Sequence, residues 1–533
     1  SLVEGCPTMW QGIIMQQRSN ISLTRTIIRD ADIAIAVNDD CTVYSDAAAY
    51  LDCIIGINVL PNVNPSNFSN VTLRIIDSKF GRVLPQFKNY YPGQNAHGLV
   101  GRAGILLHDI GMVTIGDDQQ APNEFFNLNF GVELHNSNAD ITNSRFHDIV
   151  ADGAYAQYGV LKPFGCAVTA RRDLDKIVYL NVFPLASSGL NTIENAPVGI
   201  YSNFHNKRIT GVKMSNIYKG VQSEESRACT VNVNSCIIYT RFRGIDFNEN
   251  HNALGMIAVN NEIYLEPLAG AAKGQACIYM SETLQGNDAN YYISDNWHLE
   301  TISGQAGIVA LNVENAWIQN NYIYTNESLS NPAPGSVGIA LSGGGRNTVN
   351  CNVVNNSIPH SNIGTKGIMV NVSTNNVIEC NDFGTNQSSI GPYTGMWFGG
   401  DCDVSNSITG NDMRECVTGL YLNSASRTGP QIHRGNTWHN PQIGNTTAIN
   451  QNTVNFGYLN SRFWVNTSSG VQYWPNTISP PQWFFPDPTG TTFNGCGTQI
   501  CIPALAGGGG DDEHLKSVAR DSAISFDYRE DRK

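Results

Sequence analysis

A short alternation of apolar and variable residues recurs along most of the chain. Each copy begins with a glycine or another small residue, continues with an aliphatic residue, and has a second apolar residue two positions later. The copies mostly follow one another at intervals of 21 to 35 residues. The glycines of this repeat are Gly12, Gly56, Gly104, Gly131, Gly199, Gly220, Gly244, Gly307, Gly338, Gly367, Gly395 and Gly419, with Ala34 and Cys277 in the same slot and Gly165 as a further candidate.

This repeat predicts a short β-strand with two inward side chains. Successive side chains of a strand point to opposite faces, so apolar residues two positions apart share one face. One such strand cannot bury its own apolar face, whereas stacked coils place like residues over like residues along a continuous core. We therefore expect the aliphatic residues after the glycines to point inward, among them Ile105, Val132, Ile245, Ile339 and Ile368.

A second repeat in the later coils places an asparagine between two apolar positions. It reads IQNNYI, VVNNSI, IECNDF and ITGNDM in four successive coils. Asparagine tolerates the left-handed backbone region, and its amide can hydrogen-bond to the same amide one coil away. We therefore expect an asparagine ladder at one turn of the coil, formed by Asn261, Asn296, Asn321, Asn356, Asn381, Asn411 and Asn436.

Together the repeats predict an all-β fold, a right-handed single-stranded parallel β-helix of about 15 coils. The chain resembles the right-handed parallel β-helix repeat proteins. More narrowly, the segments CPTMWQGIIMQ, TIGDDQQAPNEFFNLNFGVELHNSNADITNSRF and WFFPDPTGTTFNGCGTQIC resemble large secreted β-helix proteins of Bacteroidota. The resemblance implies export by a type IX system and an extracellular or cell-surface location. Because lyases, hydrolases, adhesins and phage spikes share this fold, it does not give the function.

The repeats divide the chain into three parts. Residues 1–445 hold the coils, with long excursions near 80–102 and 151–163. Residues 446–505 lack the repeat and are rich in aromatic residues and proline, which suits a cap over the end of the solenoid, with a sugar-stacking platform as the alternative. Residues 506–533 contain a glycine linker and a tail that ends in AISFDY.

In that tail, Ile524, Phe526 and Tyr528 alternate with polar residues, as in a strand with one apolar face. We expect this strand to pack either on its own coils or on a neighbouring subunit by β-addition. The chain begins almost directly with a coil, and an uncapped coil invites association. Head-to-tail stacking of such coils would generate an open filament.

The composition and net charge of the chain argue against some classes of binding partner. Charged residues are only 14% of the chain, which instead uses 61 asparagines and 51 glycines. The net charge of -13 argues against nucleic acids and anionic membrane surfaces, because no basic face is available to neutralise phosphates. No apolar run approaches the roughly 18 residues of a transmembrane helix.

The 13 cysteines show no CxxC pair and no zinc spacing, so no metal or other cofactor is predicted. Cys496 and Cys501 are close enough in sequence to form a disulfide. The odd total leaves at least one free thiol, and most cysteines read as small buried fillers.

Several clusters of acidic residues and histidines are candidates for catalysis. Glycoside hydrolysis needs two carboxylates about 5–10 Å apart, and adjacent coils about 4.8 Å apart can provide them. The candidate catalytic residues are Asp246, Glu249, Asp295 and Glu300. A solvated turn is the alternative explanation for each cluster, including the one that joins Arg241 and Arg243 to Asp246. A lyase of this fold would need calcium-binding carboxylates and a Lys or Arg base.

Motifs of familiar β-helix enzymes are missing from the sequence. It contains no NTD with paired DD and GHG, as in polygalacturonases, no WIDH, as in pectate lyases, and no YGFDPH, as in alginate epimerases. The P-loop, GxSxG, HExxH and EF-hand patterns are also missing. These absences argue only against those families.

The outward position between the two inward residues changes character along the chain. It is polar at Asn58, Glu133, Gln222 and Asp246 but becomes apolar in later coils. Residues at one offset stack into a stripe along the axis, and an exposed apolar stripe usually marks a contact surface. The stripe contains Tyr279, Met369, Trp397 and Tyr421. Burial under the C-terminal segment, a partner chain and a bound glycan are the three explanations for it.

Three functions follow from these observations. The first is an extracellular structural or adhesive protein that self-associates, or binds other surface proteins, through its C-terminal strand. The second is a polysaccharide-degrading β-helix enzyme, a lyase or a glycoside hydrolase, with acidic residues on the outward faces of adjacent coils. The third is a glycan-binding module that uses Trp397 and the aromatic residues of the cap.

Overall fold

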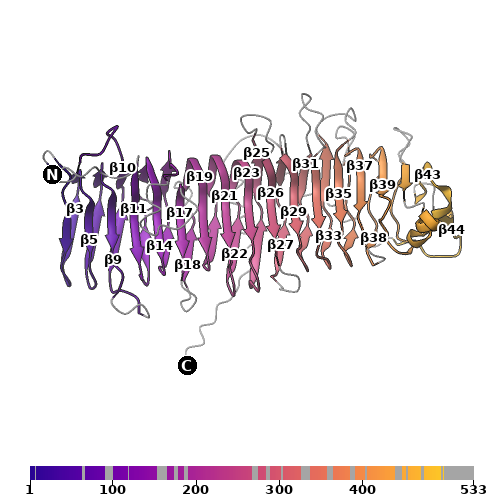
Figure 1. Cartoon of the computed structure of the whole chain (residues 1–533), viewed down its shortest axis with the longest axis horizontal. Coiled ribbons are helices and arrows are strands. Elements are labelled where there is room, and N and C mark those ends of the chain that lie inside the picture. Colours follow the sequence, from indigo (N-terminus) through magenta and orange to yellow (C-terminus); the bar gives the residue numbers. More distant parts are fainter. Residues whose placement is uncertain are drawn as a thin grey trace.

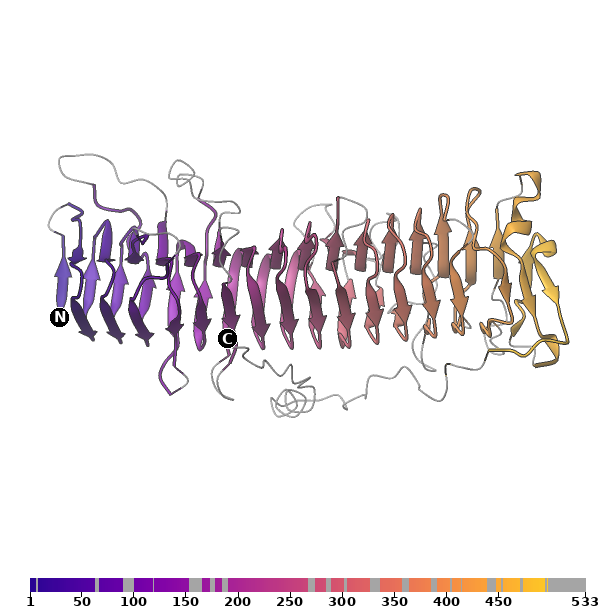
Figure 2. The ribbon, with the colours of Figure 1, turned by 90° about the horizontal axis from the view of Figure 1, so that it is seen from below.

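The computed structural model describes residues 1–5, 8–62, 67–89, 100–117, 119–152, 165–172, 178–184, 190–266, 274–283, 289–301, 304–325, 336–356, 364–384, 391–402, 405–413, 415–438, 447–451, 454–469, 473–493 and 496. Strands stack as successive coils along one long axis, in the order of the sequence (Figure 1). A view turned by 90° shows the same elongated stack (Figure 2). The strands pair in parallel, and the fold is the right-handed parallel β-helix predicted from the sequence.

Strands at equivalent positions of successive coils form three sides of the solenoid. The first side carries the glycine repeat; its strands are β2 (Ile13–Met15), β5 (Ile33–Val37), β8 (Ile55–Val59), β11 (Gly101–His108), β14 (Leu128–His135), β17 (Cys166–Arg171), β26 (Gly274–Ser281), β29 (Gly304–Leu311), β32 (Val337–Ser342), β35 (Lys366–Asn371), β37 (Thr394–Gly399), β39 (Thr418–Leu422), β41 (Thr447–Asn450) and β43 (Thr477–Ser479).

The second side is a 14-stranded sheet of β3 (Asn20–Thr24), β6 (Thr42–Asp46), β9 (Thr72–Ile76), β12 (Val113–Ile115), β15 (Ala139–Ile141), β18 (Tyr179–Val182), β20 (Asn206–Thr210), β22 (Thr230–Asn234), β24 (Gly255–Val259), β27 (Tyr291–Ser294), β30 (Trp317–Gln319), β33 (Thr348–Asn350), β36 (Val377–Glu379) and β38 (Ser407–Thr409).

The third side contains β1 (Leu2–Glu4), β4 (Ile27–Arg29), β7 (Ala49–Leu51), β10 (Lys79–Gly81), β13 (Asn123–Phe126), β16 (Ser144–His147), β25 (Glu262–Leu265), β28 (His298–Thr301), β31 (Tyr322–Thr325) and β34 (Val353–Asn356). Three strands of 12 residues each run from the third side into the first: β19 (Thr192–Asn203), β21 (Lys213–Glu224) and β23 (Ile237–Asn248). They join the two sides into one 27-stranded sheet.

The predicted aliphatic column forms the core. Ile105, Val132, Ile245, Ile339 and Ile368 are each 0% exposed and belong to one hydrophobic cluster that runs through the solenoid. The strand register places the equivalent aliphatic residues of successive coils over one another, as in the pairs Ile105 with Val132 and Ile339 with Ile368. Burying such a side chain contributes about 1.5–3 kcal/mol, so repetition of one strand pattern stabilises the whole stack.

The glycine slot is explained by close approach between coils. A Cβ on Gly104 would lie 2.7 Å from the ring of Phe125 and 2.8 Å from the carbonyl oxygen of Gly131. One coil departs from the prediction: Ala167, not Gly165, occupies the slot, because Val168 is the residue that pairs with Val132. Gly165 instead has a φ of 77°, which an L side chain rarely adopts.

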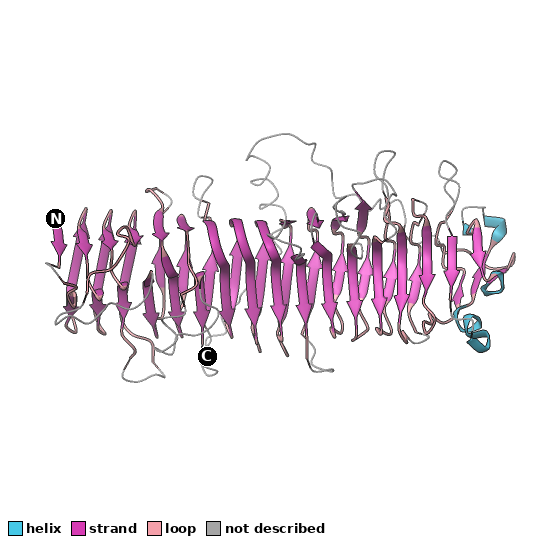
Figure 3. Cartoon of the chain, turned by 45° about the horizontal axis from the view of Figure 1, so that its top comes forward, coloured by secondary structure: helices cyan, strands magenta, loops and turns pink. Residues whose placement is uncertain are grey.

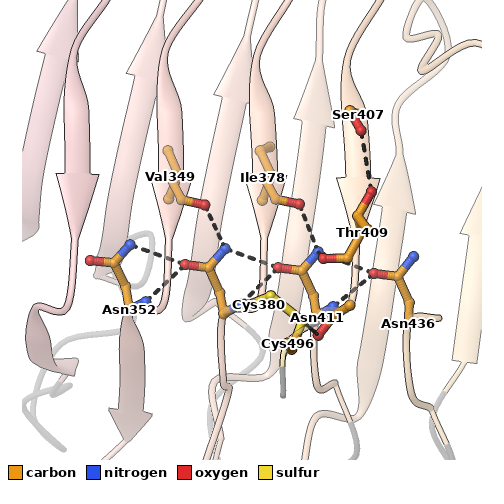
Figure 4. The surroundings of a disulfide bond; sticks show 11 residues. Val349, Asn352, Ile378, Cys380, Ser407, Thr409, Asn411, Asn436 and Cys496 are labelled. Atoms are coloured by element: carbon orange, nitrogen blue, oxygen red, sulfur yellow. Dashed lines mark hydrogen bonds between the residues drawn. A yellow bond between two sulfur atoms is a disulfide. The ribbon is translucent and has the colours of Figure 1, made fainter. Parts of the chain in front are cut away.

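The asparagine ladder exists, with one member corrected. Side-chain amides donate from coil to coil over 2.7–3.1 Å along Asn261, Asn296, Asn321, Asn352, Asn381, Asn411 and Asn436. Figure 4 shows the part of the ladder from Asn352 to Asn436. The prediction of Asn356 was wrong because it lies in β34, beyond the turn, whereas Asn352 lies in the turn itself. A shorter ladder joins Asn347, Asn376 and Asn406 at the turn between the first and second sides.

The C-terminal end is covered by irregular structure rather than by another regular coil (Figure 3). It contains the 3-10 helices η2 (Val454–Ser461), η3 (Thr467–Ser469) and η5 (Pro481–Trp483), together with a small sheet of β40 (Gln431–Ile432), β42 (Phe463–Val465) and β44 (Phe484–Pro486). The rings of Phe463 and Phe484 stack at 4.9 Å, and Trp483 packs on both. All three side chains belong to the main core cluster, so the solenoid core continues into this segment.

The predicted disulfide between Cys496 and Cys501 is wrong. Cys496 is bonded to Cys380, 116 residues earlier in the sequence, with the two Cα atoms 5.5 Å apart (Figure 4). Sequence proximity could not identify this partner, because the folded-back C-terminal segment brings Cys496 beside the turn after β36. Among the described cysteines outside this disulfide, eight are buried and Cys351 is half-buried.

Two of the sequence-based predictions involve residues that lie outside the part of the chain that the structure describes. They are the tail strand of Ile524, Phe526 and Tyr528 within residues 506–533, and Cys501. Self-assembly through the tail therefore stays a prediction. In the described part of the chain, no helix has the length and apolarity needed to cross a bilayer.

Candidate functional site

The outward residues of the first side form columns along the axis. The column that contains Asp246 runs through sixteen register positions: Ile14, Ala36, Asn58, Leu106, Glu133, Thr169, Tyr201, Gln222, Asp246, Tyr279, Val309, Ala340, Met369, Trp397, Tyr421 and Ile449. We call it the outer column. Polar and ionisable side chains concentrate in its middle coils, and apolar ones follow them.

The centre of this polar region is a carboxylate shared by two cations. Asp246 is 0% exposed, and its two oxygens accept from the Lys219 ammonium at 2.8 Å and from the Arg243 guanidinium at 2.7 Å. Lys219 and Arg243 are register partners on β21 and β23, three positions before the outer column. A fully buried carboxylate thus holds two partly exposed cations side by side on adjacent coils.

Neighbouring groups fix the direction of the Arg243 guanidinium. Its carbon lies 3.5 Å from the centre of the Tyr279 ring, as in a close cation–π contact, and its Nε donates to the side chain of Gln275 at 2.6 Å. Tyr279 is buried under this guanidinium, with 6% exposure. The guanidinium is held through its Nε, one Nη atom and one face, and its remaining N–H groups can bind a carboxylate of a ligand.

A hydrogen-bonded phenol and carboxylate lie one to two coils away; the phenol, Tyr201, is buried, and the carboxylate, Glu224, is half-buried. The Tyr201 hydroxyl donates to Glu224 at 3.0 Å, and Gln222 donates to the other oxygen of that carboxylate. Burial and the Glu224 charge raise the pKa of the Tyr201 phenol, so Tyr201 keeps its proton. The Arg171 guanidinium lies 5.4 Å from the Tyr201 ring. Burial lowers the pKa of this guanidinium.

A second charged cluster lies toward the N-terminal coils. The buried Glu133 carboxylate contacts Arg102 at 3.3 Å and the His135 ring at 2.8 Å. Burial acts to raise the pKa of Glu133, but the contacts with His135 and Arg102 outweigh it, and the net shift is downward. His108 stacks on His135 with ring centres 4.6 Å apart. Burial, reinforced by the charge of His135, lowers the pKa of His108 to about 4, so His108 is neutral near pH 7.

The four predicted catalytic carboxylates do not gather in one place. Asp246 belongs to the site on the first side. Glu249 lies in the following turn with φ 53°, and Asp295 is exposed in the turn between the second and third sides, bonded to Asn320 at 3.2 Å. Glu300 lies on the third side and contacts the His298 ring at 2.9 Å. Only Asp246 therefore contributes to the site described here.

The predicted stripe occupies the C-terminal half of the outer column. Tyr279 is buried beneath Arg243, whereas Met369, Trp397 and Tyr421 are half-buried. Tyr279 is therefore part of the charged site rather than of an exposed apolar surface. Its place could not be read from the sequence, because the residue that covers it comes from the neighbouring coil.

Sequence analysis missed five residues of the site: Arg102, Arg171, Tyr201, Lys219 and Glu224. Tyr201 lies in the outer column and the other four lie to either side of it, and these positions can be compared only when the register of the coils is known. Alignment of the glycine repeats could have found Lys219, which lies one residue before Gly220, as Arg243 lies one residue before Gly244. This shared position relative to the repeat glycine is the sequence signal that could have predicted the pairing of Lys219 with Arg243.

Two further features complete the description of possible sites. Among the described residues, no three His, Cys, Asp or Glu side chains lie together in a way that could hold a metal ion. A small pocket lies at the C-terminal end, where its lining includes His433, Arg434, Trp464 and Tyr473. That pocket contains no carboxylate and is remote from Lys219 and Arg243, which remain half-buried on β21 and β23 above the buried Asp246.

Comparisons with known proteins give little information about the function of this chain. No family model matches the chain, and no curated protein is similar to it in sequence. A solved structure described as "a new PL6 alginate lyase complex with trisaccharide" resembles it with a TM-score of 0.27 and 12% identity, over 88% of this chain and 87% of the other. At this level the likeness carries no argument about activity.

Proposed function

We propose that this protein is a polysaccharide lyase that acts on a uronate-containing polysaccharide lying along its first side. The observation that carries the proposal is the pair of cations, Lys219 and Arg243, held side by side on adjacent coils by the buried carboxylate of Asp246. A uronate presents a carboxylate next to the carbon that loses its proton, and paired cations stabilise the negative charge that develops there.

The chemistry required is β-elimination. A base removes the proton next to the carboxylate, the electrons form a carbon–carbon double bond, and the glycosidic oxygen leaves with a proton from an acid. We assign charge stabilisation to Lys219 and Arg243. The half-buried Glu224 carboxylate is the base, held in place by the hydroxyl of the buried Tyr201, and the half-buried Lys219 ammonium is also the acid that gives its proton to the leaving oxygen.

The setting of the site favours an acidic and linear ligand. The chain as a whole has a net charge of -13, yet Arg102, Arg171, Lys219 and Arg243 all lie on the outward surface of the first side. Coils repeat about every 4.8 Å, close to the length of one sugar residue, so successive sugars meet successive coils.

The test is incubation with a panel of acidic and neutral polysaccharides, followed by two measurements. Ultraviolet absorbance detects the unsaturated uronate that elimination forms, and a reducing-end assay detects cleavage of either kind. We expect absorbance and reducing ends to rise together on at least one uronate polymer. Reducing ends without absorbance would mean hydrolysis and would overturn the proposed reaction.

Variants connect the activity with the site. We expect Lys219→Met, Arg243→Met and Glu224→Gln each to reduce kcat/KM by about a hundredfold, in the range seen when one stabilising or proton-transferring group is lost. Lys79→Met is the matched control, because Lys79 forms an exposed ion pair with Glu124 on the third side. Equal activity of Lys219→Met and Lys79→Met would contradict the assignment.

A further inference from the structure

We infer that the C-terminal half of the outer column is a second binding platform for the same acidic polysaccharide, centred on Trp397 and Lys366. This inference rests on the proposed function for the identity of its ligand. Its own basis is the arrangement of Trp397, Gly399 and Lys366 on strands β35 and β37.

The indole of Trp397 lies over Gly399 of its own strand. A Cβ on Gly399 would be 2.0 Å from the Cη2 atom and 2.2 Å from the Cζ3 atom of Trp397, so the ring covers the position where a side chain at 399 would stand. Trp397 is half-buried, with Gly399 buried beneath it. A half-buried tryptophan ring on the outward side of a sheet offers an apolar plane against which the C–H face of a sugar ring can pack.

A cation accompanies this apolar plane. The Lys366 ammonium lies 5.6 Å from the centre of the Trp397 ring and comes from the preceding coil. Tyr421 is the register partner of Trp397 on the following coil, and Met369 is its partner on the preceding one. An aromatic plane beside an ammonium group fits a sugar ring that bears a carboxylate, which is the ligand class proposed for the site at Asp246.

The platform is continuous with the charged site. Asp246 and Trp397 belong to one column and are five register steps apart, about 24 Å at about 4.8 Å per coil. The intervening positions, Tyr279, Val309, Ala340 and Met369, carry no charge. A chain of several sugars that follows the axis would therefore reach Trp397 from Lys219 without crossing another ionised residue in that column.

The experiment compares long and short substrates in two variants. Trp397→Ala removes the plane, and Gly399→Ala displaces it while the tryptophan remains. We expect each variant to lower the ratio of kcat/KM on polymer to kcat/KM on a trisaccharide by about tenfold, since a trisaccharide cannot span the distance to Trp397. Trp317→Ala is the control, because Trp317 is an exposed tryptophan on β30 of the second side and should leave the ratio unchanged.

Retention in gels that contain the polysaccharide provides a measurement that does not depend on turnover. If the wild type is retained but cleaves nothing, and both variants lose retention, the platform stands and the proposed lyase function fails. If Trp397→Ala and Gly399→Ala match the wild type in both assays, the platform is wrong and the lyase function is unaffected. A wild type that is neither retained by nor active on any acidic polysaccharide would overturn both.

Discussion

The Lys219 ammonium and the Asp246 carboxylate lie 2.8 Å apart although 27 residues separate them in the sequence. The contact exists because one residue of the pair lies on β21 and the other on β23, the next coil along the axis. Asp246 is fully buried and also binds Arg243, so its charge is satisfied only while both coils keep their register.

Asp246→Asn should therefore affect both stability and activity. The amide keeps the volume of the side chain but leaves two partly buried cations without a counter-charge, so we expect unfolding free energy to fall by about 3 kcal/mol. Turnover should fall as well, because Lys219 and Arg243 lose their common anchor. Urea unfolding monitored by circular dichroism measures the first effect. The control is Glu194→Gln, which removes a more exposed pair with Arg145 and should cost at most about 1 kcal/mol.

The asparagine ladder can be tested with two neighbouring residues. Asn321 accepts from Asn296 at 2.7 Å, donates to Asn352 at 2.9 Å and donates to the Ile293 carbonyl at 3.0 Å. Asn321→Ala leaves several buried polar groups unsatisfied at about 1–3 kcal/mol each, so we expect a loss of several kcal/mol in unfolding free energy.

Its control is Asn320→Gly at the adjacent position. Asn320 is exposed and has φ 52°, a conformation that glycine adopts readily, so this variant should change stability by less than about 1 kcal/mol. If the two variants were equally stable, the ladder would be a by-product of stacking and not a source of stability.

The Cys380–Cys496 disulfide should stabilise the C-terminal segment. A bond that closes a loop of 116 residues restricts the unfolded chain, and loss of a native disulfide typically costs 2–5 kcal/mol, so we expect about that loss for Cys496→Ser. The measurement is thermal unfolding with and without a reductant. Reductant should lower the melting temperature of the wild type and leave that of Cys496→Ser unchanged. A reductant effect of equal size in both proteins would assign it to another bond.

Lys207 should make stability depend on pH. It lies on β20, points into the solenoid and donates to the Ser223 hydroxyl at 2.8 Å. Burial lowers the pKa of its ammonium to about 7 from 10.5. Between these values the unfolded chain binds a proton that the folded chain does not, so unfolding free energy rises with pH across this window, by up to about 1.4 kcal/mol per pH unit.

The corresponding measurement is urea unfolding at several pH values between 7 and 10. We expect Lys207→Met to be more stable than the wild type at pH 7 and to show a smaller rise with pH, because the buried amine is gone. Lys213→Met, at an exposed position on β21, should follow the wild-type curve. Identical slopes in all three proteins would show that Lys207 is not responsible.

The sequence by itself determined the fold of this protein. The glycine and aliphatic repeat was sufficient because each of its positions meets a structural requirement. Gly104 leaves room for the Phe125 ring, and Ile105 packs over Val132 of the next coil. Local spacing was also enough for six of the seven ladder asparagines. It failed at Asn352, because two asparagines near the same turn satisfy the same short pattern and only the strand boundary separates them.

Only the tertiary structure decided which residues share a site. Lys219, Arg243 and Asp246 meet because coil stacking brings together residues whose separation along the chain varies with turn length, and Cys496 meets Cys380 by the return of the C-terminal segment. The same stacking placed Asp246 on a different side of the solenoid from Glu300, although both had been predicted as catalytic residues. A solenoid repeat fixes the inward positions by burial, whereas an outward position acquires its chemistry from whichever side chain the next coil places beside it.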